Sequence, residues 1–402
     1  MKLNDIAEFV TDKISSSSIS LDSYVTTDSL LQNKRGREGA LNLPPVPCAL
    51  THYRQGDVLV ANIRPYLKKV WYADSEGGCS SDVLVFRAKN GHCTSFLYTV
   101  LMQDSFFEYA MLGSKGSKMP RGDKDQIMRY ELPTFTPMEE ENIGNMMVDI
   151  MSKIKVNRQI NDNLEAMAKQ LYDYWFVQFD FPNEEGKPYK SSGGAMVYNE
   201  RLKREIPVGW QVENLVDFAE IKNGATPSTS DDTNYGGDIV WITPKDLSDQ
   251  QSKFVYQGER NITKQGLDSC STSMLPINSV LMSSRAPIGL ISIAKHEVCT
   301  NQGFKSFIPK NMEDSIYLYY YIKHHIKQIE QLGTGTTFKE VSRDDLCKFS
   351  ILVVGANDAY KQWVELQDEI ANKQFVLTKE IASLTKQRDE LLPLLMNGQA
   401  QP

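Results

Sequence analysis

Two stretches of this chain combine glycine, hydroxyl and basic residues as phosphate-binding loops do: "GSKGSKMPRGDK" (113–124) and "GTGTTFKEVSR" (333–343). Glycine lets backbone N–H groups approach a phosphate closely, and the hydroxyls and cations supply the remaining hydrogen bonds and charge. Two turns, "NIRPYLKK" (62–69) and "SSRAPIG" (283–289), add arginines that are also able to hydrogen-bond to guanine. For any single loop, an ordinary polar surface turn is an equally good interpretation. Two similar loops at equivalent places in a repeat favour nucleic-acid binding.

The sequence indicates no catalytic, cofactor-binding or metal-binding residue. The spacing of a P-loop is absent from "GSKGSK" (113–118), and "GTGTTF" (333–338) has two of the three glycines of a dinucleotide fingerprint. His92–Cys93 is a poor metal pair because adjacent residues rarely ligate together, so a structural role is favoured. His324 and His325 fall in a helical pattern, where a satisfied or exposed histidine is the favoured interpretation.

The glycine-rich loops belong to an internal repeat that covers most of the chain. Phrases recur in one order in both halves, and their offset drifts by a few residues, as loop insertions produce. The matched phrases are "LNDIAEF" (3–9) with "LVDFAEI" (215–221), "YVTTDSL" (24–30) with "WITPKDL" (241–247), "GDVLVANIRP" (56–65) with "NSVLMSSRAP" (278–287), "CSSD" (79–82) with "CTNQ" (299–302), and "LGSKGS" (112–117) with "LGTGTT" (332–337). The repeat predicts one folding unit that occurs twice.

Each half ends in a stretch with residues repeated every seven positions, which predicts a long helix with a coiled-coil seam. The first seam is Ile143, Ile150, Asn157, Leu164 and Leu171, with a second row at Met147, Ile154, Asn161, Ala168 and Trp175; the other seam is Trp363, Ile370, Leu377, Leu384 and Leu391. Asn157 and Asn161 interrupt the first seam, and polar seam residues fix register at some cost in stability. The alternative is that both asparagines face solvent.

These patterns predict an α+β protein of two mixed α/β domains in pseudo-twofold arrangement, joined by two long helices. The predicted segments are a first domain at 1–137, a helix at 138–180, a linker at 181–206, a second domain at 207–356 and a C-terminal helix at 357–402. The linker is rich in Gly, Ser, Pro and charge, with one short ordered patch expected. Rigid helices of this length would fix the distance between two half-sites on a DNA duplex.

Composition narrows the class of protein further. The chain has 402 residues, enough for two or three domains, and none of its six cysteines forms a CxxC pair. Asp5 and Glu8 interrupt the N-terminal segment before a signal peptide could form, and no stretch is apolar enough for a membrane span. A reduced, cytoplasmic protein is the simplest interpretation. The net charge of −7 argues against a nonspecific polycation but is compatible with DNA binding through local basic loops.

The repeated phrases resemble those of the specificity subunits of type I restriction–modification systems. The phrases that carry the resemblance are "IPVGW" (206–210), "LVDFAEIKNGATPS" (215–228), "WITPKDL" (241–247), "VLMSSRAPIG" (280–289), "TNQGFKSF" (300–307) and "LGTGTTFKEVSRDDL" (332–346). The resemblance covers essentially the whole chain and is closer in the second half. Nothing in the first half corresponds to "IPVGW", so that domain either has a shortened start or relies on the C-terminal segment to complete it.

The resemblance implies a DNA-specificity subunit without an active site or a cofactor of its own. Each half would be a target recognition domain that reads one half of a split, asymmetric double-stranded DNA sequence, and the divergent segments 31–55 and 248–275 would suit two different half-sites. The candidate DNA contacts are Arg64, Lys68, Lys69, Lys115, Ser117, Lys118, Arg121, Thr226, Ser228, Lys245, Arg285, Lys305, Thr336, Thr337, Lys339 and Arg343.

The resemblance also implies partners. The two spacer helices would pair antiparallel as a coiled coil, set the gap between half-sites and dock two methyltransferase subunits through the heptad residues. Those partners would bind S-adenosylmethionine and methylate adenine, and restriction subunits would bring ATP- and Mg-dependent translocase and nuclease activity. Two other functions stay open. A protein-binding coiled-coil scaffold without DNA specificity is opposed by the tandem glycine-rich loops, and a self-contained nuclease lacks any recognisable carboxylate–lysine or metal cluster.

Overall fold

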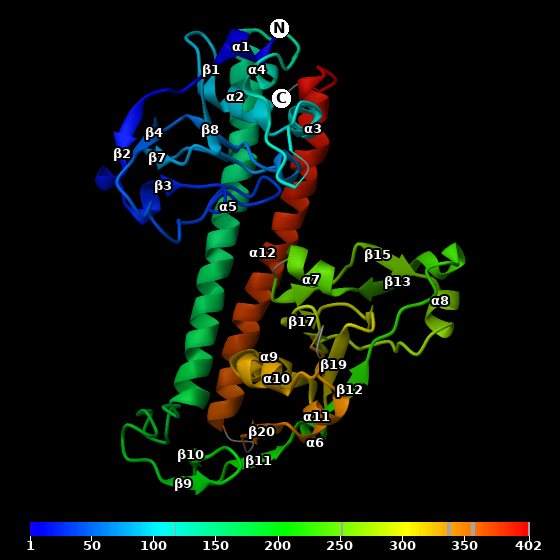
Figure 1. Cartoon of the computed structure of the whole chain (residues 1–402). Helices are drawn as coiled ribbons and strands as arrows, with labels where there is room; N and C mark the ends of the chain where they lie inside the picture. The colour runs from blue at the N-terminus through cyan, green and yellow to red at the C-terminus, as the bar shows by residue number, and fades with distance from the viewer. Residues whose placement is uncertain (117, 251, 336–338, 355–357, 401–402) are drawn as a thin grey trace. The chain divides into compact units, whose positions relative to one another are not determined.

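The structure is a computed structural model that describes all residues except 117, 251, 336–338, 355–357 and 401–402 (Figure 1). The chain divides into two compact units. The first joins Met1–Asn157 with Ile381–Pro402, and the second is Arg158–Glu380. Two long helices, α5 (Pro137–Tyr172) and α12 (Asp358–Met396), contribute residues to both units. Both helices were predicted, and α5 continues into a short π-helix, η4 (Asp173–Val177).

The first unit contains two four-stranded sheets, ordered β1-β8-β5-β6 and β2-β4-β7-β3. All neighbours are antiparallel except β3 and β7. Its elements besides α5 and α12 are α1 (Leu3–Ile6), β1 (Ala7–Phe9), β2 (Lys13–Ser15), η1 (Ser16–Ser18), η2 (Leu21–Ser23), β3 (Tyr24–Val25), β4 (Ala49–Tyr53), β5 (Val58–Ala61), η3 (Pro65–Leu67), β6 (Val70–Tyr72), β7 (Gly77–Cys79), β8 (Val83–Ala88), α2 (Thr94–Leu101), α3 (Asp104–Leu112) and α4 (Lys124–Ile127).

The C-terminal end of the chain completes the core of the first unit. Strand β5, with the sequence VLVA, is buried along its whole length, and helix α2 packs on β5, β6 and β8. Phe86 and Phe96 share this core with Leu392 and Leu395 of α12, which are only 2% and 1% exposed. Burial of these leucines agrees with the second explanation for the missing counterpart of "IPVGW", completion of the domain by the C-terminal segment.

The second unit is built around a five-stranded sheet, β12-β19-β16-β17-β14, with a three-stranded sheet β15-β13-β18 and the pairs β11-β20 and β10-β9. Its elements are β9 (Met196–Asn199), β10 (Arg204–Pro207), β11 (Gln211–Asn214), α6 (Leu215–Phe218), β12 (Ala219–Asn223), η5 (Asp232–Asn234), β13 (Tyr235–Ile242), α7 (Pro244–Gln250), β14 (Phe254–Val255), β15 (Arg260–Ile262), α8 (Lys264–Asp268), β16 (Val280–Ser284), β17 (Ile288–Ala294), β18 (Cys299–Thr300), β19 (Phe304–Pro309), η6 (Met312–Asp314), α9 (Ser315–His324), α10 (Ile326–Leu332), α11 (Arg343–Lys348) and β20 (Ser350–Val353). The predicted linker thus contains the β9–β10 hairpin.

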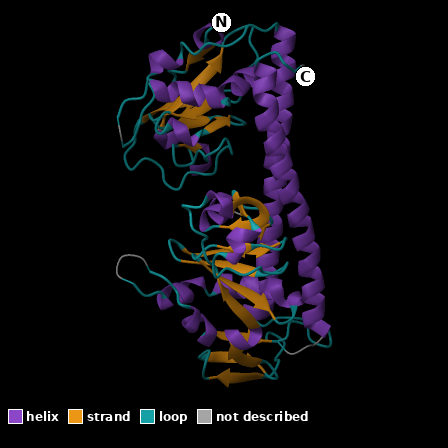
Figure 2. Ribbon diagram, turned by 90° about the vertical axis from the view of Figure 1, so that its right-hand side faces the viewer, coloured by secondary structure: helices purple, strands orange, loops and turns teal. Residues whose placement is uncertain are grey.

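An aromatic core holds the second unit together. Helices α9 and α10 lie against strand β17 (Figure 1), and Figure 2 shows helices beside the strands of this unit. Tyr317 of α9 packs with Tyr172 and Phe176 at the end of the internal helix and with Trp363 of α12. Aromatic side chains of this size bury large apolar areas, so this cluster anchors both long helices to the sheet of the second unit.

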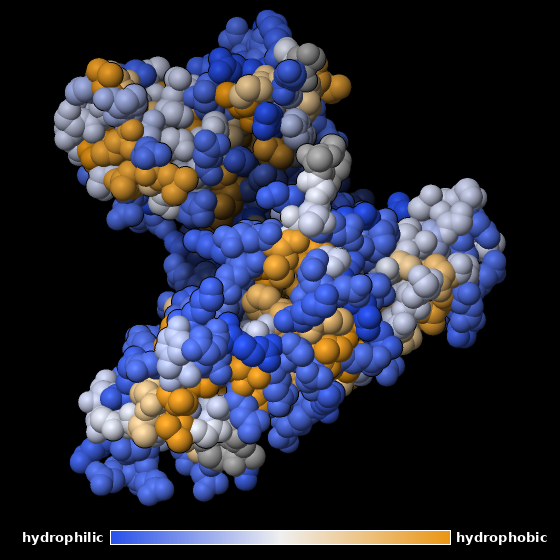
Figure 3. Space-filling view, turned by 60° about the horizontal axis from the view of Figure 1, so that its bottom comes forward, coloured by the Kyte–Doolittle hydropathy of each residue, from blue (hydrophilic) through white to orange (hydrophobic). Residues whose placement is uncertain are grey.

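The surface seen in Figure 3 is mostly hydrophilic with small hydrophobic patches.

The main sheets of the two units share the order of four strands, β1-β8-β5-β6 in the first and β12-β19-β16-β17 in the second. In the first unit β5 pairs with β8, and in the second β16 pairs with β19 in the same register. A short parallel pair accompanies each, β3 with β7 and β13 with β18. The equivalent residue pairs are Val58–Phe86 with Val280–Phe307, and Val25–Cys79 with Ile242–Thr300. The repeated phrases of the sequence therefore correspond to one sheet arrangement that occurs in both units.

Within the second unit, α5 and α12 lie side by side and antiparallel. The Gln367 side chain donates a 3.0 Å hydrogen bond to the carbonyl of Ala168, and Gln374 donates at 3.5 Å to the carbonyl of Asn161. Residue numbers therefore rise along one helix as they fall along the other. In the first unit the corresponding part of α12 packs its Leu392 against the cluster that contains Ile143 and Met147.

The heptad residues differ in burial. Ile143, Met147, Ile154, Ala168, Trp175, Trp363 and Ile370 are buried, while Ile150, Asn161, Leu164, Leu171, Leu377, Leu384 and Leu391 are half-buried. Asn157 is 6% exposed, so the alternative that it faces solvent is wrong. The prediction missed a second row in α12, namely Gln367, Gln374, Arg388 and Leu395, all buried. Three of these four are polar, so an apolar heptad pattern does not reveal them.

No helix in the described part of the chain is long and apolar enough to span a membrane.

Candidate nucleic-acid interface

The first glycine-rich loop forms a hairpin attached to the turn after β5. Lys115 and Arg121 exchange two backbone hydrogen bonds of 3.0 Å, which close the loop at its base. Arg121 also forms an isolated bridge with Ile63, and the N–H of Gly122 donates at 3.1 Å to the carbonyl of Asn62. Backbone hydrogen bonds therefore fix this hairpin to the sheet of the first unit, independently of its side chains.

The second glycine-rich loop makes the same connections in the second unit. Thr334 and Glu340 exchange backbone hydrogen bonds of 3.1 and 2.9 Å, Glu340 bridges to Arg285, and the N–H of Val341 donates at 3.0 Å to the carbonyl of Ser284. In both units a capped helix follows at once, α4 in the first and α11 in the second. The two loops are thus positioned in equivalent ways by the two sheets.

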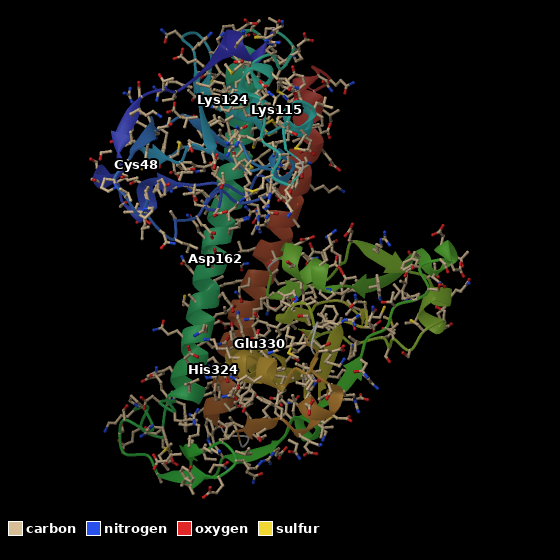
Figure 4. All side chains as sticks on the ribbon, viewed as in Figure 1. Cys48, Lys115, Lys124, Asp162, His324 and Glu330 are labelled. Atoms are coloured by element: carbon tan, nitrogen blue, oxygen red, sulfur yellow. The ribbon has the colours of Figure 1, made fainter. Side chains whose placement is uncertain are left out.

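The first hairpin presents several basic side chains. Lys118 is exposed, and Lys115, whose side chain is 84% exposed, lies 3.4 Å from the Asp123 carboxylate. Figure 4 labels Lys115 of this hairpin and Lys124, which opens the following helix α4. Ser117, another predicted contact, lies outside the described residues. The lysines of this hairpin are therefore accessible to a large anionic ligand.

The turn after β5 holds its three predicted contacts differently. Arg64 is exposed and adopts the left-handed backbone conformation, with φ of 52°, which is uncommon for a residue other than glycine. Lys68 lies 2.9 Å from the Asp104 carboxylate, and the Lys69 ammonium donates to the carbonyl of Thr27. Burial lowers the pKa of Lys69. Lys68 and Lys69 thus hold the first unit together, while Arg64 is the residue of this turn that is open to a ligand.

Each hairpin base carries an ion pair. In the first unit Arg121 Nη2 lies 2.7 Å from Asp82 Oδ1. In the second unit Glu340 lies 3.1 Å from the Lys305 ammonium and 3.8 Å from an Arg285 guanidinium nitrogen. The structure therefore brings together two predicted contacts, Arg285 directly after β16 and Lys305 in β19, through a carboxylate that the sequence did not single out.

The remaining contacts predicted around the second hairpin divide into accessible and engaged residues. Lys339 is exposed. Arg343 opens α11 and donates from Nε to the carbonyl of Ile221 at 2.9 Å, which ties that helix to β12. Thr336 and Thr337 lie outside the described residues. Among the described predicted contacts on this loop, Lys339 is therefore the one most open to a phosphate.

The segment "NGATPS" crosses close to the start of β19. At Gly224 a Cβ atom would lie 2.0 Å from a backbone oxygen, so only glycine permits this approach. The hydroxyl of Thr226 donates to the side chain of Gln302, and Ser228 Oγ lies 2.8 Å from Ser230 Oγ. Gln302 was not predicted, although it stands in the quoted phrase "TNQGFKSF".

Lys245 is exposed on α7 and pairs with Glu259 at 2.7 Å, and the carboxylate raises its pKa. This lysine stays a predicted DNA contact. Its ion pair with Glu259 would have to break before the ammonium could contact a phosphate. The surface arrangement is compatible with that exchange because ion pairs between exposed side chains are weak.

Comparisons with known proteins agree with this geometry. Residues 207–393 match the family model of the type I restriction modification DNA specificity domain. The type I restriction enzyme HindI specificity subunit of Haemophilus influenzae is 24% identical over 438 aligned positions, which cover 94% of each chain. Residues 207–393 therefore belong to the family of type I restriction–modification DNA specificity domains. The chain is also 41% identical over 149 residues to the type I restriction enzyme MjaIX specificity subunit of Methanocaldococcus jannaschii. That match spans 37% of the chain and about a third, 34%, of the relative.

A solved structure shares the fold. The S subunit of a type I restriction–modification system from M. genitalium is 13% identical, with a TM-score of 0.62 over 98% of this chain and 95% of that one. The likeness confirms the coarse prediction of a mixed α/β protein with a long internal helix and a C-terminal helix.

A buried charge network in the second unit was not predicted. Glu165 of α5 accepts hydrogen bonds from Lys323 at 2.7 Å and Tyr320 at 2.9 Å, and Lys253 donates to Tyr320 at 2.8 Å and to Gln374 of α12 at 3.2 Å. Burial lowers the pKa of Lys253 to about 8. Burial opposes ionisation of Glu165, but the two lysines hold its pKa below the usual value. The network ties both long helices to the sheet of the second unit.

The histidines have structural surroundings, as the sequence favoured. His92 lies 2.9 Å from the buried carboxylate of Glu140. His325 bonds through Nδ1 to the carbonyl of Tyr321 and stacks on its ring at 4.2 Å. Burial lowers the pKa of His325 to about 4, so it is neutral at pH 7. His324 is exposed (Figure 4).

Proposed function

We propose that this chain is a DNA-specificity subunit that reads a bipartite, asymmetric DNA sequence, one half-site through 1–137 and the other through 207–356. The observation that carries the proposal is the matched pair of hairpins, which are held by equivalent backbone hydrogen bonds. Each offers exposed basic side chains, such as Lys118 in the first and Lys339 in the second. Phosphate contacts of this kind position a protein on DNA, while side chains that differ between the units read the sequence.

We propose further that α5 and α12 act as an antiparallel coiled-coil spacer between the two half-site readers, in a pseudo-twofold subunit. The contacts of Gln367 and Gln374 with α5 support an antiparallel pair in the second unit. Asn157 and Asn161 would fix the register of this pair, because a buried amide tolerates few alternative alignments. Segment 181–206 would connect the internal helix to the second reader.

The partners in this proposal are two methyltransferase subunits and the restriction subunits. Trp363 and Ile143 are buried, so the surface that meets a partner would be formed by exposed apolar residues of the same helices. Ile160, Met167 and Tyr174 are 43%, 54% and 37% exposed and stand seven residues apart, which places them on one face. Exposed apolar side chains gathered on a helix face are typical of protein docking surfaces.

The specificity subunit is a non-catalytic component in this account, and the chemistry belongs to its partners in the cytoplasm. The methyltransferase subunits would bring S-adenosylmethionine and methylate adenine, and the restriction subunits would bring ATP and Mg. The chain itself would bind no cofactor. Its own contribution would be to choose the DNA sequence at which those activities are used.

Selection from a random DNA pool tests the proposal. The purified complex of this chain with its methyltransferase partner is incubated with double-stranded DNA that contains a long randomised region, and the bound fraction is sequenced over several rounds. The proposal predicts two short enriched blocks separated by a fixed gap. A stable complex that enriches no sequence, or a single uninterrupted block, would contradict it and favour the protein-binding scaffold.

A further inference from the structure

The base of each hairpin places two residues opposite each other, and the charge of the residue on the hairpin side is reversed between the units. Hydrogen bonds from Gly122 to Asn62 and from Val341 to Ser284 define the alignment. Gly122 therefore corresponds to Val341, and the residues that precede them, Arg121 and Glu340, correspond to each other. Ile63 forms a β-bridge with Arg121, and Arg285 forms one with Glu340, so Ile63 corresponds to Arg285.

In the first unit this place offers hydrogen-bond donors. The Arg121 side chain is 57% exposed, and one of its nitrogens is held at 2.7 Å by Asp82. The opposite residue, Ile63, has no polar side-chain atom. A guanidinium held from one side by a carboxylate is oriented and keeps its other N–H groups for a ligand.

In the second unit the same place offers an acceptor. The Glu340 side chain is 41% exposed, and its carboxylate is held by the nearly buried Lys305 at 3.1 Å. Arg285 lies beside it at 3.8 Å. Lys305 therefore balances much of the negative charge from within the sheet, and the exposed edge of the carboxylate remains an acceptor next to a cation.

The reversal of charge at this position indicates which part of the DNA it contacts. A site that contacts a DNA phosphate gains from a cation and loses from a carboxylate, because every phosphate carries negative charge. Base edges differ from one pair to the next, and guanine presents acceptors in the major groove where cytosine presents an amino donor. A position that is arginine in one reader and glutamate in the other therefore fits a base edge better than a phosphate.

We propose that the position shared by Arg121 and Glu340 is a specificity-determining position that reads one base in each half-site. Arg121 selects guanine through its O6 and N7 atoms, and Glu340 selects cytosine through its N4 amino group. The inference rests on the proposed function, since it assigns base readout to hairpins that are proposed to meet DNA.

The test compares variants of the methyltransferase complex in the DNA selection described above and in binding assays at several salt concentrations. Arg121→Lys keeps the charge but loses the planar fork that matches guanine. We expect it to lower discrimination at one base pair of one half-site by about tenfold or more, while the salt dependence of binding and the other half-site stay unchanged. Glu340→Gln is expected to relax one position in the other half-site alone.

Two controls make the outcome decisive. Lys118→Ala, a change at an exposed lysine on the same hairpin, should weaken binding to all sequences equally and reduce the salt dependence. Thermal unfolding of each variant shows whether it is folded, which matters for Glu340→Gln because Lys305 loses its charged partner. If Arg121→Lys keeps full discrimination, the inference is overturned. If Arg121→Ala reduces the salt dependence at all sequences and discrimination is unchanged, Arg121 is a phosphate contact and the inference is also overturned.

Failure of the inference differs visibly from failure of the proposed function. A wild-type complex that selects a split sequence, with variants that select the same sequence equally well, overturns only the role of Arg121 and Glu340. A wild-type complex that selects no split sequence overturns the proposed function itself.

Discussion

The two compact units share the strand order of their main sheets but are assembled from the sequence in different ways. The second unit is one continuous stretch, Arg158–Glu380, whereas the first joins Met1–Asn157 with Ile381–Pro402. Both place a glycine-rich hairpin against the turn of a central strand, through the same backbone hydrogen bonds. The comparison separates two properties. Backbone geometry is common to both units, whereas continuity of the chain and the charges at the hairpin base are not.

The largest expected effect concerns continuity. Removal of residues 381–402 takes Leu392, Leu395 and Met396 out of the core of the first unit. Burial of three such side chains contributes about 5–9 kcal/mol, which is comparable with the total stability of a domain. We expect the first unit to unfold and the second to stay folded, as measured by limited proteolysis with mass-spectrometric mapping of the cleavage sites.

A matched pair of point variants controls for helix shortening. Leu395→Ala in the full chain should destabilise the first unit by about 2–5 kcal/mol, whereas Leu394→Ala, at a neighbour that is 40% exposed, should cost little. Equal protection of residues 1–157 in the truncated and the full chain would show that the C-terminal segment is not needed, and the contrast between the units would fail.

The charge network should matter only to the second unit. Glu165→Gln leaves Lys253 buried without its carboxylate, and the loss of one partner of a buried ion pair costs about 3–5 kcal/mol. Thermal unfolding should show the transition of the second unit lowered and that of the first unchanged. Glu259→Gln, which breaks an exposed pair in the same unit, is the control and should not move either transition. A Glu165→Gln chain with wild-type unfolding would mean that the network contributes nothing.

The second unit should also be the more sensitive to mild acid. Because the folded-state pKa of His325 is about 4, below the ordinary value of 6.5, the unfolded chain binds more protons between these pH values. Its contribution to stability is therefore present above pH 6.5 and is lost as the pH falls towards 4, by about 3 kcal/mol in total. Denaturant unfolding at pH 7 and pH 5 measures the loss.

His325→Phe should flatten this pH dependence, while His296→Gln, at an exposed histidine of the same unit, should preserve it. If His325→Phe unfolds with the same pH dependence as the wild type, other groups are responsible for the acid sensitivity and the role given to His325 is wrong.

The hairpins should behave alike where the units are alike. Lys118→Ala in the first and Lys339→Ala in the second each remove one exposed lysine. If each meets one phosphate, the slope of log affinity against log salt becomes shallower by about 0.9 for either variant. An unchanged slope for one of them would show that its lysine does not contact the backbone and that the two hairpins dock differently.

The smallest expected effect concerns the helix pair. Asn157 is buried, and its side-chain nitrogen has no hydrogen-bond partner among the described residues. Asn157→Leu should therefore raise the stability of the first unit by about 1 kcal/mol. The same variant should select DNA with more than one gap length if the asparagine fixes register. Asn163→Leu, at an exposed position of α5, serves as control, and a less stable Asn157→Leu chain would contradict the assignment.

The sequence was informative where function depends on local pattern. The repeated phrases, the glycine-rich loops and the long helices were predicted because glycine placement and heptad spacing leave local signals. The alignment of one pair of phrases was off by one residue, because the parallel strand pairs match Cys79 with Thr300 and not with Cys299. Pro65 corresponds to Pro287, so Arg64 takes the place of Ala286, and both adopt positive φ. Arg285 therefore corresponds to Ile63, as the matched phrases align them, and the bridges of both residues to the hairpins agree.

Contacts between distant residues left no such signal. Glu165 and Lys253 are 88 residues apart, and Lys253 stands in the divergent segment that the repeat did not align. The engagement of Lys68 with Asp104 and of Arg121 with Asp82 was equally invisible, since a basic residue in a loop has the same sequence pattern whether it is paired or free. The roles of the predicted DNA contacts stay predictions. Three of these residues, Ser117, Thr336 and Thr337, lie outside the described part of the chain.

The most direct test of the central claim is the DNA methylation pattern of a cell. A host that lacks the modification would express the methyltransferase partner with or without this chain, and its genome would be sequenced by a method that detects modified adenine. The account predicts a new motif only when the chain is present, with two short and different half-sites at a fixed gap. Methylation that is absent despite a stable complex, or that occurs at a single uninterrupted motif, would contradict the claim that the two units read two half-sites.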